Sequence, residues 1–164
     1  MSGVALAKNE ARITVEDVPD QPGASHRLFA ELALQGIAVD MIIQNAGTEG
    51  TADISFTVTD QDLPAALQIT ERVAEAISAA GVTHNPDVAK VSVVGMGMAN
   101  AEGVAATMFN ALSAAEINVH MITTSEIKIS VLVDRHNAQK SVEAAHKAFG
   151  LDGFVDDSLV TGSL

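Results

Sequence analysis

The sequence predicts an α+β protein of two similar units, each an antiparallel sheet with helices on one face. Three observations lead to this prediction. Segments with an apolar residue at every second position, typical of strands, are interleaved with segments whose apolar residues share one helical face. The same order of segments occurs twice, roughly 75 to 80 residues apart, in a chain of 164 residues. Hydrophobic residues make up 48% of the chain, so each unit can bury a core.

The first repeat opens with a strand near residues 11–15, in which Ile13 and Val15 alternate with polar residues. The turn Asp20-Gln21-Pro22-Gly23 follows, and we expect Pro22 in the first turn of a helix, where its missing N–H is not needed. The apolar face of that helix comprises Leu28, Phe29, Leu32 and Ala33, with Gly36 as its left-handed cap.

The first repeat continues with two strands and a second helix. Alternating apolar residues predict strands over Ile37–Ile43 and Ile54–Val58, joined by a turn at Gly47–Gly50. The helix that follows has an apolar stripe of Leu63, Leu67, Val73 or Ala74, and Ile77. The remaining expectations are a cap by Asp60 or Asp62, Pro64 in the first helical turn, Gly81 as the helix end, and a weak fourth strand or linker over residues 82–88.

The second repeat matches the first. The matched pairs are Val15 and Val93, Gly23 and Gly103, Phe29 and Phe109, Leu32 and Leu112, Ile37 and Ile117, Met41 and Met121, and Asp53 and Lys128. The expected elements are a strand near 89–94, a helix near 103–115, strands near 118–124 and 127–133, a helix near 137–149 capped by Gly150, and a last strand within 153–161.

Each copy has the element order of a ferredoxin-like βαββαβ unit. We predict one domain over residues 10–85 and a second over residues 86–164, with residues 1–9 as an extra strand that joins the second domain. A unit of about 75 residues has a small core, and one face of its sheet needs cover. Pairing between units or between chains is therefore expected.

Composition excludes several functions. The formal net charge is −12 and neither Trp nor Tyr is present, so the chain repels phosphate backbones and offers few stacking platforms for nucleic acid. The absence of cysteine rules out disulfides, thiolate metal sites and a cysteine nucleophile. No signal-like segment and no apolar run near 18 residues occurs, so we expect a cytoplasmic protein without a membrane partner.

The turn at Asp20–Gly23 is the first candidate site. The first N–H groups of a helix have no intrahelical partners and carry partial positive charge, so they favour a carboxylate or another anion. Gly23 has no Cβ, which lets a ligand approach the backbone closely. The alternative is that this segment is only a strand-to-helix turn.

Several strings resemble the tandem ACT domains of aspartate kinases. They are Asp20–Gly23, Val39–Asn45 and Asp53–Phe56 for the first domain, and Lys90–Met98 and Ile117–Val131 for the second, with Thr123-Thr124-Ser125-Glu126-Ile127 the most specific. The segment that would bind ATP and aspartate is not in this sequence, so the resemblance implies a regulatory (beta) subunit or regulatory region without kinase activity of its own. It further implies a homodimer through the ACT domains, a catalytic (alpha) subunit as partner, and feedback inhibition of the first step of aspartate-family amino-acid biosynthesis.

By resemblance, a threonine effector binds at the N-terminus of the first helix. Asp20 suits its ammonium group, the backbone N–H groups suit its carboxylate, and Gln44 would bind its hydroxyl or carboxylate. The second unit would close the site by backbone contacts across the dimer. The expected set is Asp20, Gly23, Ala24, Ser25, Gln44, Asn118 and Val119. The alternative for Gln44 and Asn118 is that they are strand residues facing water.

A second expected site takes lysine, because two carboxylates can hold its side-chain ammonium through charge-assisted hydrogen bonds. Its residues are Asp40, Thr124, Ser125 and Glu126. Gly47 stands where relatives with a lysine site often carry serine, so one hydroxyl contact is lost. The alternative is that Ser125 and Glu126 only form a turn that pairs the dimer.

No other motif supports a catalytic, metal or cofactor site. Gly95-Met96-Gly97-Met98 lacks the third glycine of a dinucleotide fingerprint, because Asn100 stands there. The histidines have no metal-ligand spacing and are expected at the surface or in the sheet; they are His26, His84, His120, His136 and His146. A free-standing amino-acid sensor and a structural dimerisation module are the alternative functions, and a separate enzyme is disfavoured because no acid, base or nucleophile constellation is present.

Overall fold

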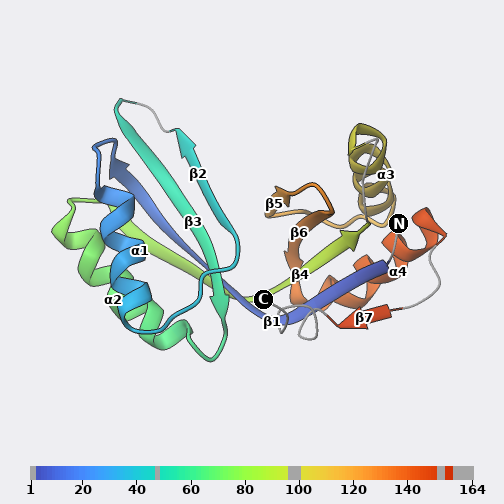
Figure 1. The fold of residues 1–164 in the computed structure, drawn as a ribbon, viewed down its shortest axis with the longest axis horizontal. Coiled ribbons are helices and arrows are strands. Elements are labelled where there is room, and N and C mark those ends of the chain that lie inside the picture. Colours follow the sequence, from blue (N-terminus) through green and yellow to red (C-terminus); the bar gives the residue numbers. More distant parts are fainter. Residues whose placement is uncertain (1–2, 47–48, 96–100, 151–153, 157–164) are drawn as a thin grey trace. The chain divides into compact units, whose positions relative to one another are not determined.

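The computed structural model describes residues 3–46, 49–95, 101–150 and 154–156. The chain divides into two compact units (Figure 1), residues 9–86, called the first unit, and residues 1–8 with 87–164, called the second unit. Two long strands, β1 (Gly3–Pro19) and β4 (Gly81–Val94), contribute residues to both units.

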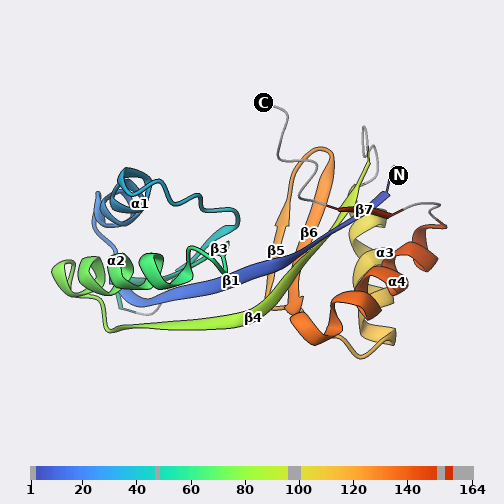
Figure 2. The ribbon, with the colours of Figure 1, turned by 90° about the horizontal axis from the view of Figure 1, so that it is seen from below.

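The first unit is a four-stranded sheet with two helices on one face (Figure 2). Its strands lie in the order β2-β3-β1-β4, and β3 pairs antiparallel with both β1 and β2. Between β1 and β4 the elements are α1 (Ala24–Leu34), β2 (Ile42–Ala46), β3 (Thr51–Thr59) and α2 (Leu63–Ala76). This is the topology of a ferredoxin-like unit, so the predicted fold class is confirmed.

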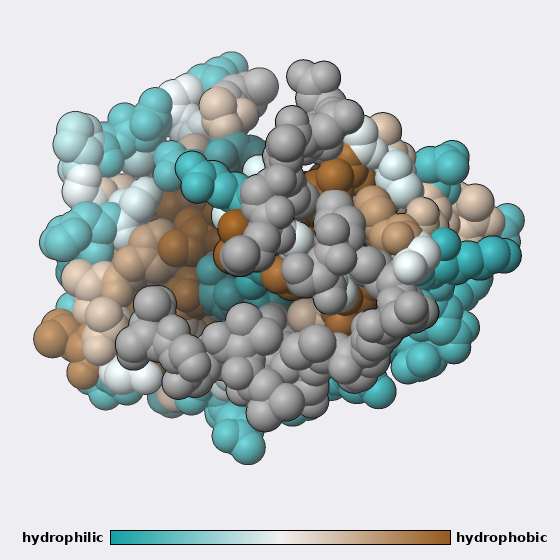
Figure 3. Space-filling view, turned by 45° about the vertical axis from the view of Figure 1, so that its right-hand side comes forward, coloured by the Kyte–Doolittle hydropathy of each residue, from teal (hydrophilic) through white to brown (hydrophobic). Residues whose placement is uncertain are grey.

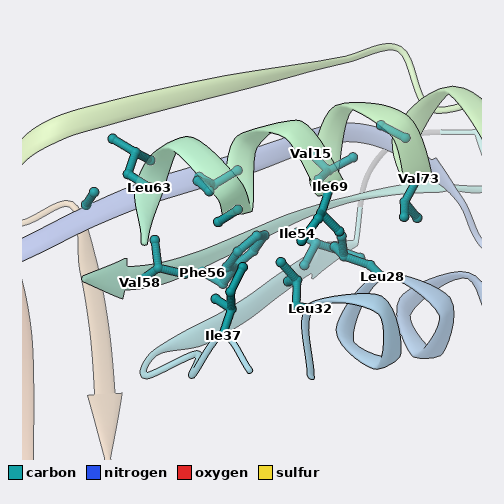
Figure 4. Close-up of a cluster of buried hydrophobic side chains, with 14 of the residues drawn as sticks. Val15, Leu28, Leu32, Ile37, Ile54, Phe56, Val58, Leu63, Ile69 and Val73 are labelled. Carbon is teal, nitrogen blue, oxygen red and sulfur yellow. The ribbon is translucent and has the colours of Figure 1, made fainter. Parts of the chain in front are cut away.

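Apolar side chains of both helices pack onto this sheet (Figure 4). Leu28 and Leu32 of α1 point toward Phe56 of β3, and all three are buried. Val73 of α2 belongs to the same cluster, and the ring of Phe29 meets that of Phe56 edge to face at 5.6 Å between centroids. Burial of each such side chain contributes about 1.5–3 kcal/mol, so the core fixes α1 against the sheet.

The second unit repeats this plan with one strand more. Its elements besides β1 and β4 are α3 (Ala101–Ala114), β5 (Met121–Thr124), β6 (Lys128–Asp134), a short 3₁₀ turn (Arg135–Asn137), α4 (Ala138–Phe149) and β7 (Phe154–Asp156). The strand order is β7-β1-β4-β6-β5. Val4 and Leu6 of β1 are buried in the core of this unit, so the start of the chain supplies a strand between β4 and β7.

The predicted strand over Ile37–Ile43 is wrong, because β2 begins only at Ile42. Ile37 and Met41 are buried, as their alternation indicates, but the N–H of Ile37 donates to the Leu32 carbonyl at 3.0 Å. The residues after α1 therefore close the helix C-terminus before they join the sheet. Residue Ile117 makes the same bond after α3, which explains why β5 begins at Met121 and not near residue 118.

Two boundaries around β4 also differ from the prediction. Residues 82–88 and 89–94 form one continuous strand, with Pro86 exposed on its edge, where a proline needs no ladder partner. Gly81 does not end α2. Ser78 ends the helix instead, and it has a left-handed backbone with φ +62°. The N–H of Ser78 donates to the Glu75 carbonyl at 3.2 Å.

Left-handed residues end the other helices. Gly36 after α1 and Gly150 after α4 have φ +71° and +60°, which confirms both predicted caps. The position after α3 that matches Gly36 holds Glu116, with φ +58°. A side chain with a Cβ is disfavoured there, so this helix end is strained relative to its counterpart in the first unit.

We predict that Glu116→Gly raises the free energy of unfolding by about 0.5–1 kcal/mol, because relief of the left-handed strain exceeds the entropy that glycine adds to the unfolded chain. Urea denaturation measures the change. Glu143→Gly, on the exposed face of α4, is the matched control and should lower stability by about 1 kcal/mol. Equal losses for both variants would contradict the account of Glu116.

Candidate effector site

The turn after β1 leads directly into α1. The helix begins at Ala24, and its N-cap residue is Gly23, with φ +94° and ψ −13°. Pro22 therefore precedes the helix, which corrects the prediction that it lies in the first turn; the left-handed backbone of Gly23 separates the two. Glycine has no side-chain oxygen to cap the helix. The N–H of Ala24 donates to the Gln21 carbonyl at 3.4 Å, and the N–H groups that follow it in the first turn suit another acceptor.

Backbone hydrogen bonds tie this turn to the neighbouring hairpin. The N–H of Asp20 donates to the Gly50 carbonyl at 2.8 Å, and the N–H of Gln21 donates to the Pro19 carbonyl at 2.8 Å. The side chain of Asp20 is exposed. A carboxylate is thus held on a fixed backbone next to the helix N-terminus, where it can meet an ammonium group.

Gln44 reaches the helix N-terminus from β2. Ser25 Oγ and Gln44 Oε1 are 3.4 Å apart, and Gln44 pairs in register with Ile54, whose side chain is buried under the helices. Gln44 therefore lies on the helix side of the sheet. The contact is long for an O–H···O bond, so either group can turn toward a ligand at little cost.

The expected site residues Asn118 and Val119 belong to the second unit, in the segment between α3 and β5. Asn118 is exposed and Val119 half-buried. An open hollow of about 410 Å³ lies beside them, lined by Phe109, Leu112, Ser113, Glu116, Ile117, Asn118 and Val119. The segment is fixed at His120, whose Nε2 lies 2.8 Å from Asp134 Oδ1 and whose N–H donates to the Leu132 carbonyl at 2.8 Å.

The residues expected to bind lysine fall into both units. Thr124, Ser125 and Glu126 are exposed at the β5–β6 turn of the second unit, and Asp40 is exposed in the first. The N–H of Ser125 donates to the Lys128 carbonyl at 2.8 Å, and its Oγ accepts the Ile127 N–H at 3.4 Å. The hydroxyl of Ser125 is thus oriented by the turn and keeps its own proton to donate.

The glycine of the second repeat that matches Gly23 lies within a helix. Gly103, matched to Gly23 in the sequence, is the third residue of α3, and its carbonyl accepts the Thr107 hydroxyl at 2.8 Å. Of the glycine- and methionine-rich string, Met96, Gly97 and Met98 lie outside the described residues, as do Gly47 and Thr48. The predicted strand within 153–161 is described only over β7.

Polar and apolar groups both reach the surface. Figure 3 shows hydrophobic residues between hydrophilic ones on the face that it draws. Ile42 of β2 and Ile122 of β5 occupy matching positions on edge strands and are 49% and 44% exposed. In the part of the chain that the structure describes, no helix has the length and apolar character to span a bilayer, and no three His, Asp or Glu side chains gather as metal ligands.

The chain is thus a tandem of ferredoxin-like units, of which the first has a polar strand residue beside a helix N-terminus. Comparison with known proteins identifies the class to which this fold belongs. A family model for the ACT domain matches residues 13–73 and 91–149. An aspartate kinase of Stutzerimonas stutzeri is 40% identical over 93% of this chain, which spans 37% of that relative's length.

Two solved structures match over nearly their whole chains. One, from a crystal structure of aspartokinase alpha and beta subunits, is 45% identical with a TM-score of 0.85, covering 92% of this chain and 99% of that one. The regulatory subunit of aspartate kinase from Thermus thermophilus is 40% identical with a TM-score of 0.84. The match covers 90% of this chain and 97% of that one. The chain therefore belongs to the ACT-domain regulatory regions of aspartate kinases.

We predict that Gly23→Ala lowers the free energy of unfolding by about 1 kcal/mol, because alanine is strained at a positive φ. No described heavy atom lies within 4 Å of a Cβ built there, so the loss would come from the backbone and not from a clash. Gly81→Ala, equally open but without a positive φ, is the matched control. Equal stability of both variants would contradict the strained turn.

Proposed function

We propose that this chain is the effector-binding part of an aspartate kinase and that threonine binds at the N-terminus of α1. The observation that carries the proposal is the 3.4 Å approach of Ser25 Oγ and Gln44 Oε1 beside the left-handed Gly23. The helix N–H groups suit the carboxylate of threonine, Asp20 suits its ammonium, and Gln44 suits its hydroxyl or carboxylate.

The proposed site is completed by a second copy of the chain. Asn118 and Val119 of the second unit would approach the effector by backbone contacts across a homodimer, over the hollow that they line. The positions of β2 and β5 at the two ends of the described strand order support pairing of chains, since an edge strand can pair with another chain.

Inhibition would pass to a separate catalytic subunit, or to a kinase domain, that carries the ATP and aspartate sites. The similarity to a chain from a structure with alpha and beta subunits supports this partner. Threonine can inhibit only as far as it binds one arrangement of the chains more tightly than the other.

Lysine is the second proposed effector, at Asp40 of the first unit and Thr124, Ser125 and Glu126 of the second. The exposed carboxylates of Asp40 and Glu126 support it, since each can accept charge-assisted hydrogen bonds from an ammonium. If both sites act, the two effectors inhibit together.

We predict that Gln44→Ala raises the dissociation constant for threonine about tenfold and leaves the fold intact, because one hydrogen bond to the ligand is lost. Isothermal titration calorimetry of the full chain measures it. Asn45→Ala, the next residue on the opposite face of β2, is the matched control and should bind normally. Wild-type affinity in Gln44→Ala would remove Gln44 from the site.

We also predict that threonine raises the melting temperature. A ligand at 100 times its dissociation constant adds about 2.7 kcal/mol, which corresponds to about 5–10 °C for a chain of this size. The melting temperature with lysine alone, and with lysine and threonine together, tests the second site. Isoleucine and methionine serve as control ligands. No shift with threonine or lysine would contradict the proposal and favour a structural dimerisation module.

A further inference from the structure

Strand β1 contains a bulge just before the candidate site. Its register with β3 shifts between Val15 and Val18, so Glu16 and Asp17 stand opposite the single residue Asp53. Val15 and Val18 are both buried, and a regular strand would bring only one of them to the helix side.

The side chain of Asp53 holds this bulge. Asp17 has φ +52°, a backbone conformation that costs a residue with a Cβ free energy. Its N–H donates to Asp53 Oδ1 at 2.9 Å, and Thr51 Oγ1 donates to Asp17 Oδ1 at 3.3 Å. Both acceptors are carboxylates, so both bonds are charge-assisted, and the shorter one is the bond from the bulged backbone N–H to Asp53.

Only two residues separate the bulge from the effector turn. Val18 is buried in the core, and Pro19 pairs with Thr51 before Asp20 begins the turn. The bulge therefore determines where the chain leaves the sheet and so where the turn Asp20–Gly23 lies. We propose that Asp53 is a positioning residue for the effector site and acts through the backbone of Asp17. This proposal rests on the proposed function.

Asp53 cannot share the direct role of Gln44, because the two lie on opposite faces of the sheet. Gln44 pairs with Ile54, whose buried side chain points to the helices, and Asp53 precedes Ile54 in the same strand. Side chains alternate along a strand, so Asp53 points away from the helix side and from Ser25.

The second repeat has a different hydrogen bond at the position that matches Asp17. Counting from the matched valines Val15 and Val93, Gly95 takes the place of Asp17, and Lys128 is matched to Asp53. The N–H of Gly95 donates to the Ile127 backbone carbonyl at 2.7 Å, and not to a carboxylate. The carboxylate bond thus occurs in the same unit as the left-handed Gly23 turn.

Three variants of the full chain test the proposal: Asp53→Ala, Asp53→Asn and, as control for the lost charge, Glu71→Ala on the exposed face of α2. Two readouts are calorimetric threonine affinity and amide hydrogen exchange of residues 17–25 without ligand. We expect Asp53→Ala to weaken binding about tenfold and to speed exchange. The dissociation constant of Asp53→Asn for threonine should stay within about threefold of the wild-type value, since the asparagine amide oxygen can still accept the Asp17 N–H.

The outcomes separate this proposal from the proposed function. A wild-type chain that binds no threonine contradicts the proposed function, and the exchange of residues 17–25 still decides the role of Asp53. Unchanged exchange in Asp53→Ala, or asparagine as damaging as alanine, overturns the proposal. If Asp53→Ala does not fold, Asp17→Gly in the same chain removes the backbone strain; recovered folding and binding would support the proposal, and no recovery would overturn it.

Discussion

Strand β1 has to bury Ile13, Val15 and Val18 on one face, and a regular strand cannot do so because its side chains alternate. The bulge absorbs the extra residue, returns Val18 to the core and sets where the chain leaves the sheet. The start of α1 depends on that exit, while Leu28 and Leu32 hold the helix against β3. The candidate site is thus built on the ends of a strand and a helix that are themselves fixed by the core.

The two repeats share the pairing of their central strands. Thr14 and Ser55 in the first unit form a cross-strand hydroxyl contact of 2.8 Å, and Ser92 and Ser130 form one of 2.7 Å in the second. The strands of the two units therefore share their register. The matched glycines lie in different places, because Gly23 is the left-handed N-cap of α1 and Gly103 is inside α3.

Apolar periodicity was sufficient to predict the order of elements, matched residues predicted the duplication, and glycines after the helical patterns predicted the caps Gly36 and Gly150. It could not predict the hydrogen bond from the Ile37 N–H to the last turn of α1. A buried apolar residue fits equally well in a strand and in a segment that closes a helix. The left-handed Ser78 and Glu116 carry no sequence signal, since neither is glycine or asparagine. The spacing from Val15 to Val18 does signal the bulge, but only once the pairing with β3 is known. The approach of Gln44 to Ser25 required the same pairing, whereas the contribution of Asn118 and Val119 is still a proposal.

The most direct test of the central claim is an amide NMR titration of the full chain with threonine. We expect saturable shifts centred on the amides of Gly23, Ala24 and Ser25 and on the side-chain amide of Gln44, because the ligand carboxylate and hydroxyl would bind there. Shifts confined to other parts of the chain, or none at all at saturating threonine, would contradict it.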